Sequence, residues 1–265
     1  LYKANRDARP EDLVRQLDPI QRMVRALGLR LEVSQGCEAD DCIASLAARF
    51  AGEHPVIIVS GDKDLKQCLG PNVYMWDPAS KEEKLVSEAD FTAESGVTPG
   101  QWPDVQALLG DTSDNIPGVP GIGPKTARQI FSICPSLEDI RDHFVLLPPK
   151  LQAKLQEHLE NMFIWRQLTT LSREACPGVT LDDLRVRPLD AATCALLTEE
   201  FELFALRREP LWTVCRPPRP TCPRNSWMRA ASGRTLGPQP GKRRPRNRLP
   251  CRWPSLPAAV APPAR

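Results

Sequence analysis

Three clusters of acidic residues lie where secondary-structure elements are expected to begin or end. They are Glu38, Asp40 and Asp41; Asp62 and Asp64; and Asp111 and Asp114. Carboxylates gathered at the carboxyl ends of parallel strands, where open sheets bind ligands, repel one another unless cations lie between them. Hard divalent cations such as Mg²⁺ prefer oxygen ligands, and two ions about 4 Å apart can activate a water and stabilise the leaving oxygen of a phosphodiester. The clusters therefore predict a two-metal site for phosphodiester hydrolysis.

Each cluster also has a structural explanation that requires no metal. Acidic residues in the first turn of a helix are favoured by capping and by the helix dipole, which alone would account for Glu38, Asp40 and Asp41. The other two clusters suit turns, N-caps and Asx-turns. The presence of all three in order makes this explanation much weaker for the set than for any single cluster.

A parallel α/β arrangement would bring the clusters together. We expect a helix from Pro10 to about Ala26, a strand at 29–33, a helix at 38–51 and a strand at 56–59. The last of these is an unbroken β-branched run, typical of a strand buried on both faces of a parallel sheet. Helices alternating with strands predict right-handed crossovers and a parallel sheet.

Strand signals fade after about Ser87, and short helices are expected instead. These helices are predicted at 87–95, 99–109, 125–131, 136–143, 148–172 and 190–207. The chain is thus expected to comprise an α/β domain at 1–86, a helical domain at 87–207 and a tail at 208–265.

A loop rich in Gly and Pro leads directly into one of these helices. Its candidate binding residues are Gly118, Gly121, Ile122, Gly123, Lys125 and Thr126. Glycines allow a tight turn and close approach of another backbone, and amides at a helix N-terminus bind phosphate. The spacing does not match a nucleotide-binding P-loop, and no buried strand precedes it. A plain packing corner between two helices is the structural alternative.

The N-terminal segment adds two basic side chains, Lys3 and Arg6, within Tyr2-Lys3-Ala4-Asn5-Arg6. Basic residues in a polar segment are usually solvated. Beside a carboxylate–metal cluster, however, they would offset the charge on a scissile phosphate.

The net charge of +2 hides two unlike segments. Residues 208–265 contain 13 Lys and Arg, one acidic residue and 13 of the 28 prolines, whereas acidic residues exceed basic ones before them. We expect this tail to be disordered and assign it no function, because it resembles an unrelated or out-of-frame extension. No apolar run approaches the roughly 20 residues of a membrane span, so we expect no membrane association.

The nine cysteines have no spacing typical of a metal site or a disulfide framework. None forms a Cys-x-x-Cys pair, and only three histidines are present. Reduced thiols in a cytoplasmic protein are therefore expected.

These motifs together resemble, in order, the 5′→3′ exonuclease domain of bacterial DNA polymerase I and its flap-endonuclease relatives. The match is carried by Tyr2-Lys3-x-Asn5-Arg6, Glu38-Ala39-Asp40-Asp41, Ser60-Gly61-Asp62-Lys63-Asp64-Leu65, Gly110-Asp111-x-Ser113-Asp114-Asn115-Ile116-Pro117-Gly118-Val119 and Gly121-Ile122-Gly123-x-Lys125-Thr126-Ala127. It covers residues 1 to about 207. The resemblance implies a PIN-like α/β domain followed by a helical domain with a helix–hairpin–helix motif, and a metal-dependent 5′ nuclease acting as a monomer on flap, nicked or branched DNA.

The resemblance also implies roles for the candidate residues. Glu38, Asp40 and Asp41 resemble ligands of a first Mg²⁺ or Mn²⁺, and the Asp pairs of the later clusters resemble ligands, direct or through water, of a second. Lys3 and Arg6 resemble residues that contact the scissile phosphate. The hairpin at 118–125 resembles a clamp on the DNA backbone, whose carbonyls in the family often hold a K⁺ ion shared with a phosphate.

One departure lowers the expected activity. Family members carry two further Asp ligands on strands ahead of the Tyr-Lys-x-Asn-Arg segment, and roughly the first 80 residues of the family domain are missing here. We therefore expect an incomplete first metal site and little or no cleavage by this chain. A non-catalytic, structure-selective DNA-binding fragment, a PIN-like ribonuclease and a metal-free scaffold remain alternatives.

Overall fold

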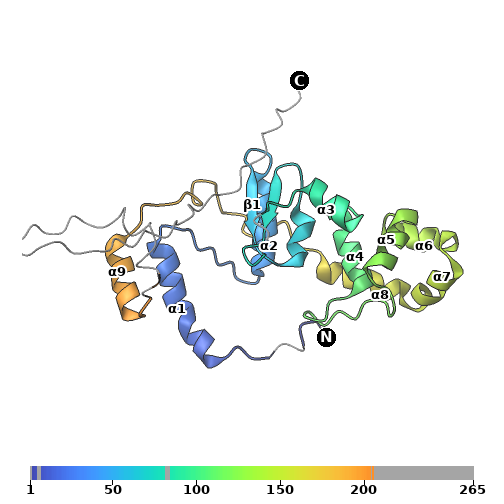
Figure 1. Ribbon diagram of the computed structural model, residues 1–265, viewed down its shortest axis with the longest axis horizontal. Helices are drawn as coiled ribbons and strands as arrows, with labels where there is room; N and C mark the ends of the chain where they lie inside the picture. Colours follow the sequence, from blue (N-terminus) through green and yellow to red (C-terminus); the bar gives the residue numbers. More distant parts are fainter. Residues whose placement is uncertain (1, 5–6, 81–83, 204, 206–265) are drawn as a thin grey trace, which may run out of the picture. The chain divides into compact units, whose positions relative to one another are not determined.

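The computed structural model describes residues 2–4, 7–80, 84–203 and 205 (Figure 1). The chain divides into two compact units, one formed by residues 1–25 and 29–187 and the other by 26–28 and the residues from 188 on. The three acidic clusters and the hairpin all belong to the first unit. Arg6 and the tail expected at 208–265 lie outside the described residues.

A parallel pair of strands forms the sheet of the first unit, as the sequence predicts. Strand β1 (Val56–Val59) runs beside β2 (Val73–Trp76), with Val56 opposite Val73 and Val59 opposite Trp76. The expectation that β1 is buried on both faces is wrong, because Val59 is 52% exposed. Sequence patterning missed β2, because Val73–Trp76 lacks the unbroken β-branched run that identified β1.

The strand expected at 29–33 is absent, and those residues are irregular. Helix α1 (Glu11–Ala26) precedes them and α2 (Ala39–Phe50) follows, so both expected helices are present. Within the described part of the chain, β1 and β2 form a two-stranded sheet, and the further bridges of β2 are to Val86 and Gly70. Val33 is 71% exposed. Alternating side chains make a strand only where a neighbouring strand accepts its backbone hydrogen bonds.

Helices make up the rest of the first unit. They are α3 (Glu88–Ser95), α4 (Trp102–Leu109), α5 (Pro124–Ile133), α6 (Leu137–Asp142), α7 (Pro149–Leu155) and α8 (Leu159–Thr169). Short 3₁₀ turns lie at Lys63–Cys68 (η1), Pro99–Gln101 (η2), Phe144–Leu146 (η3) and Gln156–His158 (η4). The single helix expected at 148–172 is broken between α7 and α8, because His158 leaves helical torsion angles at φ −116° and ψ 1°.

The second unit contains α9 (Ala191–Glu200), whose N-terminus is capped by the side chain of Asp190. The helix expected at 190–207 therefore ends earlier, where Glu202 takes a left-handed φ of 53°. No helix among the described residues is both long and apolar enough to cross a lipid bilayer.

A continuous apolar core connects the sheet to the helices of the first unit. It contains Ile58 and Met75 from the strands, Leu65 from η1, Leu108 from α4 and Met162 from α8. Leu108 and Met162 are fully inaccessible to solvent, and Leu65 is 2% exposed. Because η1 and α4 share this core, the acidic residues that follow β1 and those that follow α4 rest on the same packed support.

Candidate metal centre

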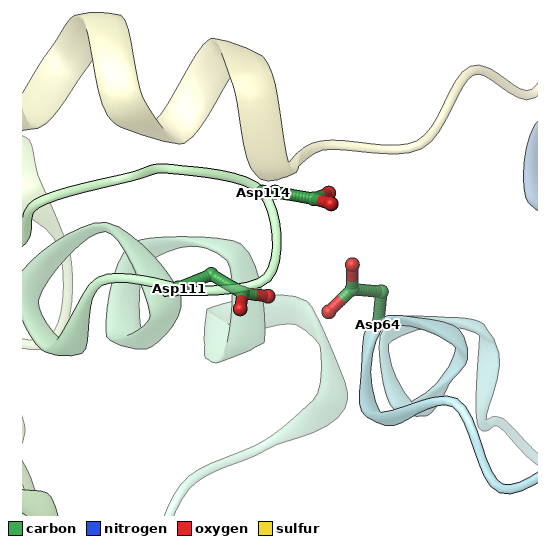
Figure 2. A group of neighbouring side chains, drawn as sticks. All are labelled: Asp64, Asp111 and Asp114. Carbon is green, nitrogen blue, oxygen red and sulfur yellow. The ribbon is translucent and has the colours of Figure 1, made fainter. Parts of the chain in front are cut away.

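Three carboxylates converge beside η1 and the loop that follows α4. Asp64, Asp111 and Asp114 each offer one carboxylate oxygen, and these oxygens lie within 4.8 Å of one another (Figure 2). Asp111 and Asp114 are only 6% and 8% exposed, and Asp64 is half-buried. Buried carboxylates so close together repel one another, and three oxygen ligands form a donor set that suits a hard divalent cation.

The first turn of η1 positions Asp64. The Asp62 carboxylate caps this turn by accepting a hydrogen bond from the Asp64 amide at 3.0 Å, and the side-chain amide of Gln106 on α4 donates to Asp64 Oδ1. Burial raises the pKa of Asp64 above its ordinary value against the effect of the Gln106 hydrogen bond, and the negative charges of Asp62 and Asp111 raise it further. A bound cation would stabilise the ionised form of Asp64 and so lower its pKa again.

Asp111 is held in its ionised form by its neighbours. Ser113 donates to Asp111 Oδ1 from its amide at 3.0 Å and from its hydroxyl at 2.5 Å, and Lys63 Nζ lies 2.9 Å from Asp111 Oδ2. Burial alone would raise the pKa of Asp111, but the hydrogen bonds from Ser113 and Lys63 outweigh it and leave the pKa lowered. Asp111 is therefore charged and available as a ligand at neutral pH.

Two glycines close the loop that carries Asp111 and Asp114. Gly110 and Gly118 have φ values of 74° and 65°, in the left-handed region that favours glycine. A Cβ on Gly118 would lie 2.4 Å from the backbone nitrogen of Gly110, so the two ends of the loop touch. The backbones of Asp111 and Ile116 exchange hydrogen bonds of 2.8 and 2.7 Å across it. The loop thus fixes both aspartates through its backbone rather than through side-chain packing.

The N-terminal segment contacts the same cluster. The Lys3 amide donates to the carbonyl of Asp114 at 2.9 Å, and the Tyr2 hydroxyl donates to Asp114 Oδ2 at 3.3 Å. Lys3 Nζ lies 3.9 Å from Asp114 Oδ2 and also contacts Glu38 Oε2. Burial opposes the charge on Lys3, but the hydrogen bond to Glu38 raises its pKa above the ordinary value. Lys3 therefore links the first acidic cluster to the third.

The remaining predicted ligands lie outside the group of three. Asp41 Oδ1 accepts a hydrogen bond from the Ser172 amide at 2.8 Å, and Asp40 Oδ1 accepts one from the Asp41 amide. Glu38 occupies the N-cap position of α2, but its side chain makes no capping hydrogen bond there. Burial raises the pKa of Asp40, and the charges of Glu38 and Asp41 add to this effect. In this cluster and at Asp62, capping and turn formation account for part of the acidic pattern.

The hairpin predicted from the sequence joins α4 to α5. Gly123 is the N-cap of α5 and has no side chain to cap the helix. Pro124 is the first residue of the helix, and Lys125 and Thr126 follow in its first turn. Ile122 is 6% exposed and packs in the core, whereas Lys125 is exposed.

The carbonyl at the tip of the hairpin is paired within the chain. Gly121 has a φ of 74°, and its carbonyl accepts a hydrogen bond from Lys154 Nζ on α7 at 2.7 Å. The residues expected to hold K⁺ therefore fit that ion only in part, because an ammonium group already contacts one of the carbonyls.

Sequence reasoning missed three residues of these sites. Lys63 stands between Asp62 and Asp64, so the motif itself pointed to a role for it near the acidic cluster. Gln106 and Lys154 had none, because their roles depend on how α4 and α7 pack against distant segments.

Comparisons with known proteins agree with this architecture. Residues 1–96 match the family described as "5'-3' exonuclease, N-terminal resolvase-like domain", and residues 97–192 match "5'-3' exonuclease, C-terminal SAM fold". These matches confirm the expected order of an α/β domain and a helical domain. The predicted domain limits, 1–86 and 87–207, remain predictions.

Relatives of known sequence and structure share most of this chain. It is 44% identical over 202 residues to the thermostable DNA polymerase I of Thermus thermophilus, covering 76% of this chain and 24% of the polymerase. It is 36% identical over 184 residues to a 5'-3' exonuclease of Bacillus subtilis, covering 69% of this chain and 62% of that protein.

A solved structure shows a similar fold at lower identity. A bacteriophage T5 flap endonuclease, described as a pseudo-enzyme-product complex with DNA and metal ions, matches with a TM-score of 0.54 at 23% identity. The match covers 76% of this chain and 77% of that one. The chain thus spans about a quarter of the length of the polymerase and somewhat under two thirds of the Bacillus protein.

Proposed function

Because the chain belongs to the 5′-3′ exonuclease family, we propose that it binds DNA ends, flaps, nicks or branches and hydrolyses their phosphodiester bonds with divalent metal ions. The convergence of Asp64, Asp111 and Asp114 carries this proposal. Three carboxylate oxygens with no sulfur or imidazole ligand favour Mg²⁺ or Mn²⁺ over a softer metal.

Asp64, Asp111 and Asp114 would hold one of the ions, with Asp62 acting through water. When bound, such ions lower the pKa of a water and neutralise charge on the phosphate oxygens. The protein's own contribution is to keep these carboxylates ionised and in place. Ser113 does this for Asp111, and Gln106 does it for Asp64.

The first acidic cluster would line a second, weaker metal site. Glu38, Asp40 and Asp41 are the ligands proposed for it. The raised pKa of Asp40 and the contact between Glu38 and Lys3 support a concentration of negative charge there. The bond from the Ser172 amide to Asp41 reduces what that carboxylate can offer a metal. This supports the expectation that the site is incomplete and cleavage is weak.

Lys3 and Arg6 are proposed to contact the scissile phosphate. The position of Lys3 Nζ between Glu38 and Asp114 supports this for Lys3, since a phosphate bridging the two acidic clusters would meet the ammonium group. The same contact with the scissile phosphate is proposed for Arg6 from its place in the motif alone.

The hairpin would hold the DNA backbone on either side of the cleavage point. Uncapped amides at the start of α5, together with Lys125 and Thr126, can hydrogen-bond phosphate without reading base sequence. Gly121 and Gly123 would let the DNA backbone come close, whereas Gly118 is buried against Gly110 and shapes the loop. Ile122 anchors the turn in the core. A K⁺ ion remains a proposal at the hairpin carbonyls, but we derive no step through it because Lys154 contacts the Gly121 carbonyl.

A bacteriophage T5 relative is described in complex with DNA and metal ions, which supports DNA as the partner. We propose that the chain acts as a monomer in the cytoplasm.

Cleavage of a labelled 5′-flap DNA in Mg²⁺ or Mn²⁺ tests the function. We expect slow cleavage that EDTA abolishes, and a loss of about 100-fold or more on Asp111→Asn, because removing one ligand charge weakens the ion and its effect on water. Glu157→Gln, at an exposed position in η4, serves as the matched control and should leave the rate unchanged. A flap-specific product that persists in EDTA would contradict the proposal.

The hydrogen bond from the Ser172 amide to Asp41 favours one second candidate, a DNA-binding module without catalysis. Flap binding that is unaffected by EDTA, with no product in any metal, would identify it. An RNA flap of the same sequence distinguishes a ribonuclease, and calorimetry with Mn²⁺ distinguishes a metal-free scaffold.

A further inference from the structure

Two cysteines far apart in the sequence lie in contact. Cys42 Sγ on α2 and Cys176 Sγ in the segment after α8 are 2.9 Å apart, although 134 residues separate them. Cys176 is 4% exposed and Cys42 is half-buried. Their meeting belongs to no pattern in the sequence, because neither is part of a Cys-x-x-Cys pair.

The segment at 172–179 is fixed to α2 by hydrogen bonds around the two sulfurs. Ser45 donates from Oγ to the carbonyl of Ser172 at 3.2 Å and accepts from the amide of Ala175 at 2.8 Å. Ser45 is 1% exposed. The cysteines therefore face each other across a buried, hydrogen-bonded contact.

Arg49, two turns after Cys42 on α2, binds the same segment. Its Nη1 donates to the carbonyls of Cys176 and Val179, both at 2.8 Å, and its Nη2 donates to that of Ala175 at 3.4 Å. Cys176 takes a φ of 54°, which is rare for a residue with a side chain. Surrounding contacts thus impose a backbone conformation on Cys176 that aims its sulfur at Cys42.

We propose that Cys42 and Cys176 form a reversible disulfide that ties α2 to the segment at 172–179. The sulfurs of a disulfide lie about 2 Å apart, so the two sulfurs need to approach each other only slightly further to form the bond. The bond would join the region matched to the N-terminal domain to the region matched to the C-terminal one.

The oxidant is a small-molecule disulfide such as oxidised glutathione. One cysteine thiolate attacks a sulfur of the small disulfide and displaces the first small thiolate. The attacking cysteine and the attacked sulfur are then joined in a mixed disulfide. The second cysteine then attacks the protein sulfur of that mixed disulfide and displaces the other small thiolate. Two electrons pass to the oxidant, and the two protons lost by the cysteines are taken up by the two released thiolates.

The bond would stabilise the fold independently of any nuclease activity. It closes a covalent loop from Cys42 to Cys176, which restricts the unfolded chain far more than the folded one. It would also secure the first turn of α2, where Asp40 and Asp41 immediately precede Cys42.

The test uses the full chain with Cys215, Cys222 and Cys251, which lie outside the described residues, replaced by serine. The protein is incubated with oxidised glutathione at mildly alkaline pH for hours, because the burial of Cys176 and the half-burial of Cys42 slow exchange. Remaining thiols are alkylated, and the protein is digested and analysed by mass spectrometry.

We expect a loss of two hydrogen masses, a crosslinked peptide pair containing Cys42 and Cys176, and a melting temperature higher by about 5–10 °C. Dithiothreitol should reverse the increase. Cys37→Ser, which removes an exposed thiol nearby in the chain, should keep both effects, whereas Cys42→Ser and Cys176→Ser should lose them.

Three results would overturn the proposal. The first is glutathione adducts that persist on either cysteine, and the second is a crosslink to a different cysteine. The third is recovery of both cysteines as alkylated thiols from the folded protein under conditions that fully oxidise a denatured control. Peptide mapping of the protein that retains both cysteines decides these outcomes even if a serine variant fails to fold. Because the test measures no DNA cleavage, its result is separate from that of the proposed function.

Discussion

The side-chain amide of Gln106, 3% exposed on α4, donates a hydrogen bond to the carboxylate of Asp64 in η1. The other end of the same amide, Oε1, is buried and has no hydrogen-bond partner among the described residues. Gln106 thus supports one metal ligand while leaving a polar atom of its own unsatisfied. An unsatisfied buried acceptor lowers the free energy of unfolding by about 1–3 kcal/mol. Gln106 therefore orients Asp64 at the expense of fold stability.

Replacing Gln106 by methionine separates these two effects. Gln106→Met should weaken Mn²⁺ binding by about three- to tenfold, because the pKa of Asp64 rises further without the hydrogen bond. The free energy of unfolding should stay the same or increase, since the unsatisfied oxygen is removed at similar volume. Isothermal titration calorimetry and chemical denaturation measure the two quantities. Unchanged Mn²⁺ affinity would contradict the role of Gln106.

Lys63 competes with a cation for Asp111. Lys63→Met should tighten Mn²⁺ binding by about threefold, because it frees Asp111 Oδ2 and removes a like charge 2.9 Å from that oxygen. The measurement is again calorimetry at low ionic strength. Lys66→Met, on the same 3₁₀ turn but near Phe91 and Trp102, is the matched control and should change the affinity little. Weaker binding by Lys63→Met would show that Lys63 supports the site instead.

The close contact between Gly118 and Gly110 predicts a large loss of stability on substitution. Gly118→Ala should destabilise the fold by about 2–4 kcal/mol, because its φ is left-handed and the new Cβ would meet backbone atoms that cannot move aside. Gly52→Ala is the control, since a Cβ there meets no atom within 4 Å. Urea denaturation monitored by circular dichroism compares the two. Equal effects would mean that the loop relaxes easily.

The start of α3 predicts a dependence of stability on pH. Hydrogen bonds from Lys84 and then from Ser87 lower the pKa of Asp90 to about 2. The folded pKa lies below the unfolded value, so Asp90 stabilises the fold above about pH 4 and loses this contribution as the pH falls toward 2.

Denaturation at a series of pH values tests this dependence. Asp90→Asn should flatten the decline in stability between pH 4 and pH 2 relative to the unchanged protein. Asp142→Asn, at an exposed site whose pKa is lowered mainly by Arg141, provides a comparison. A decline of the same steepness in Asp90→Asn would exclude Asp90 as its source.

Lys154 should contribute one phosphate contact at the hairpin. Lys154→Ala should weaken binding to nicked duplex DNA and reduce the slope of log K against log salt concentration by about 0.9, because one fewer counterion is released. Lys150→Ala removes an exposed lysine from the same helix and is the matched control. Fluorescence anisotropy at several salt concentrations measures both slopes, and equal slopes would place no phosphate at Lys154.

Local patterns predicted most helices and the strand β1, because their apolar periodicity and capping residues are encoded within each segment. They failed where the outcome depends on a distant partner. Residues 29–33 alternate like a strand but have no strand beside them, and β2 lacks the β-branched run that identified β1. The break at His158 likewise falls in a segment that contains no Gly or Pro to mark it.

The same distinction applies to the candidate site. The types and order of Asp64, Asp111 and Asp114 were sufficient to select them from the sequence, and the structure brings their carboxylates together. The bond from Ser172 to Asp41 and the contact between Lys154 and Gly121 join segments 131 and 33 residues apart. No single-sequence pattern encodes such pairings.

The loop that follows α4 connects the carboxylate group directly to the hairpin. The last residue of α4 is followed by Gly110, and the touching glycines 110 and 118 fix how far Asp111 and Asp114 lie from the start of α5. A DNA strand gripped at the hairpin would therefore present the same internucleotide linkage to the carboxylates whatever its bases. The fold would thus set the number of nucleotides between the hairpin contact and the cut. Lengthening the 110–118 loop should shift the position of the cut without abolishing it.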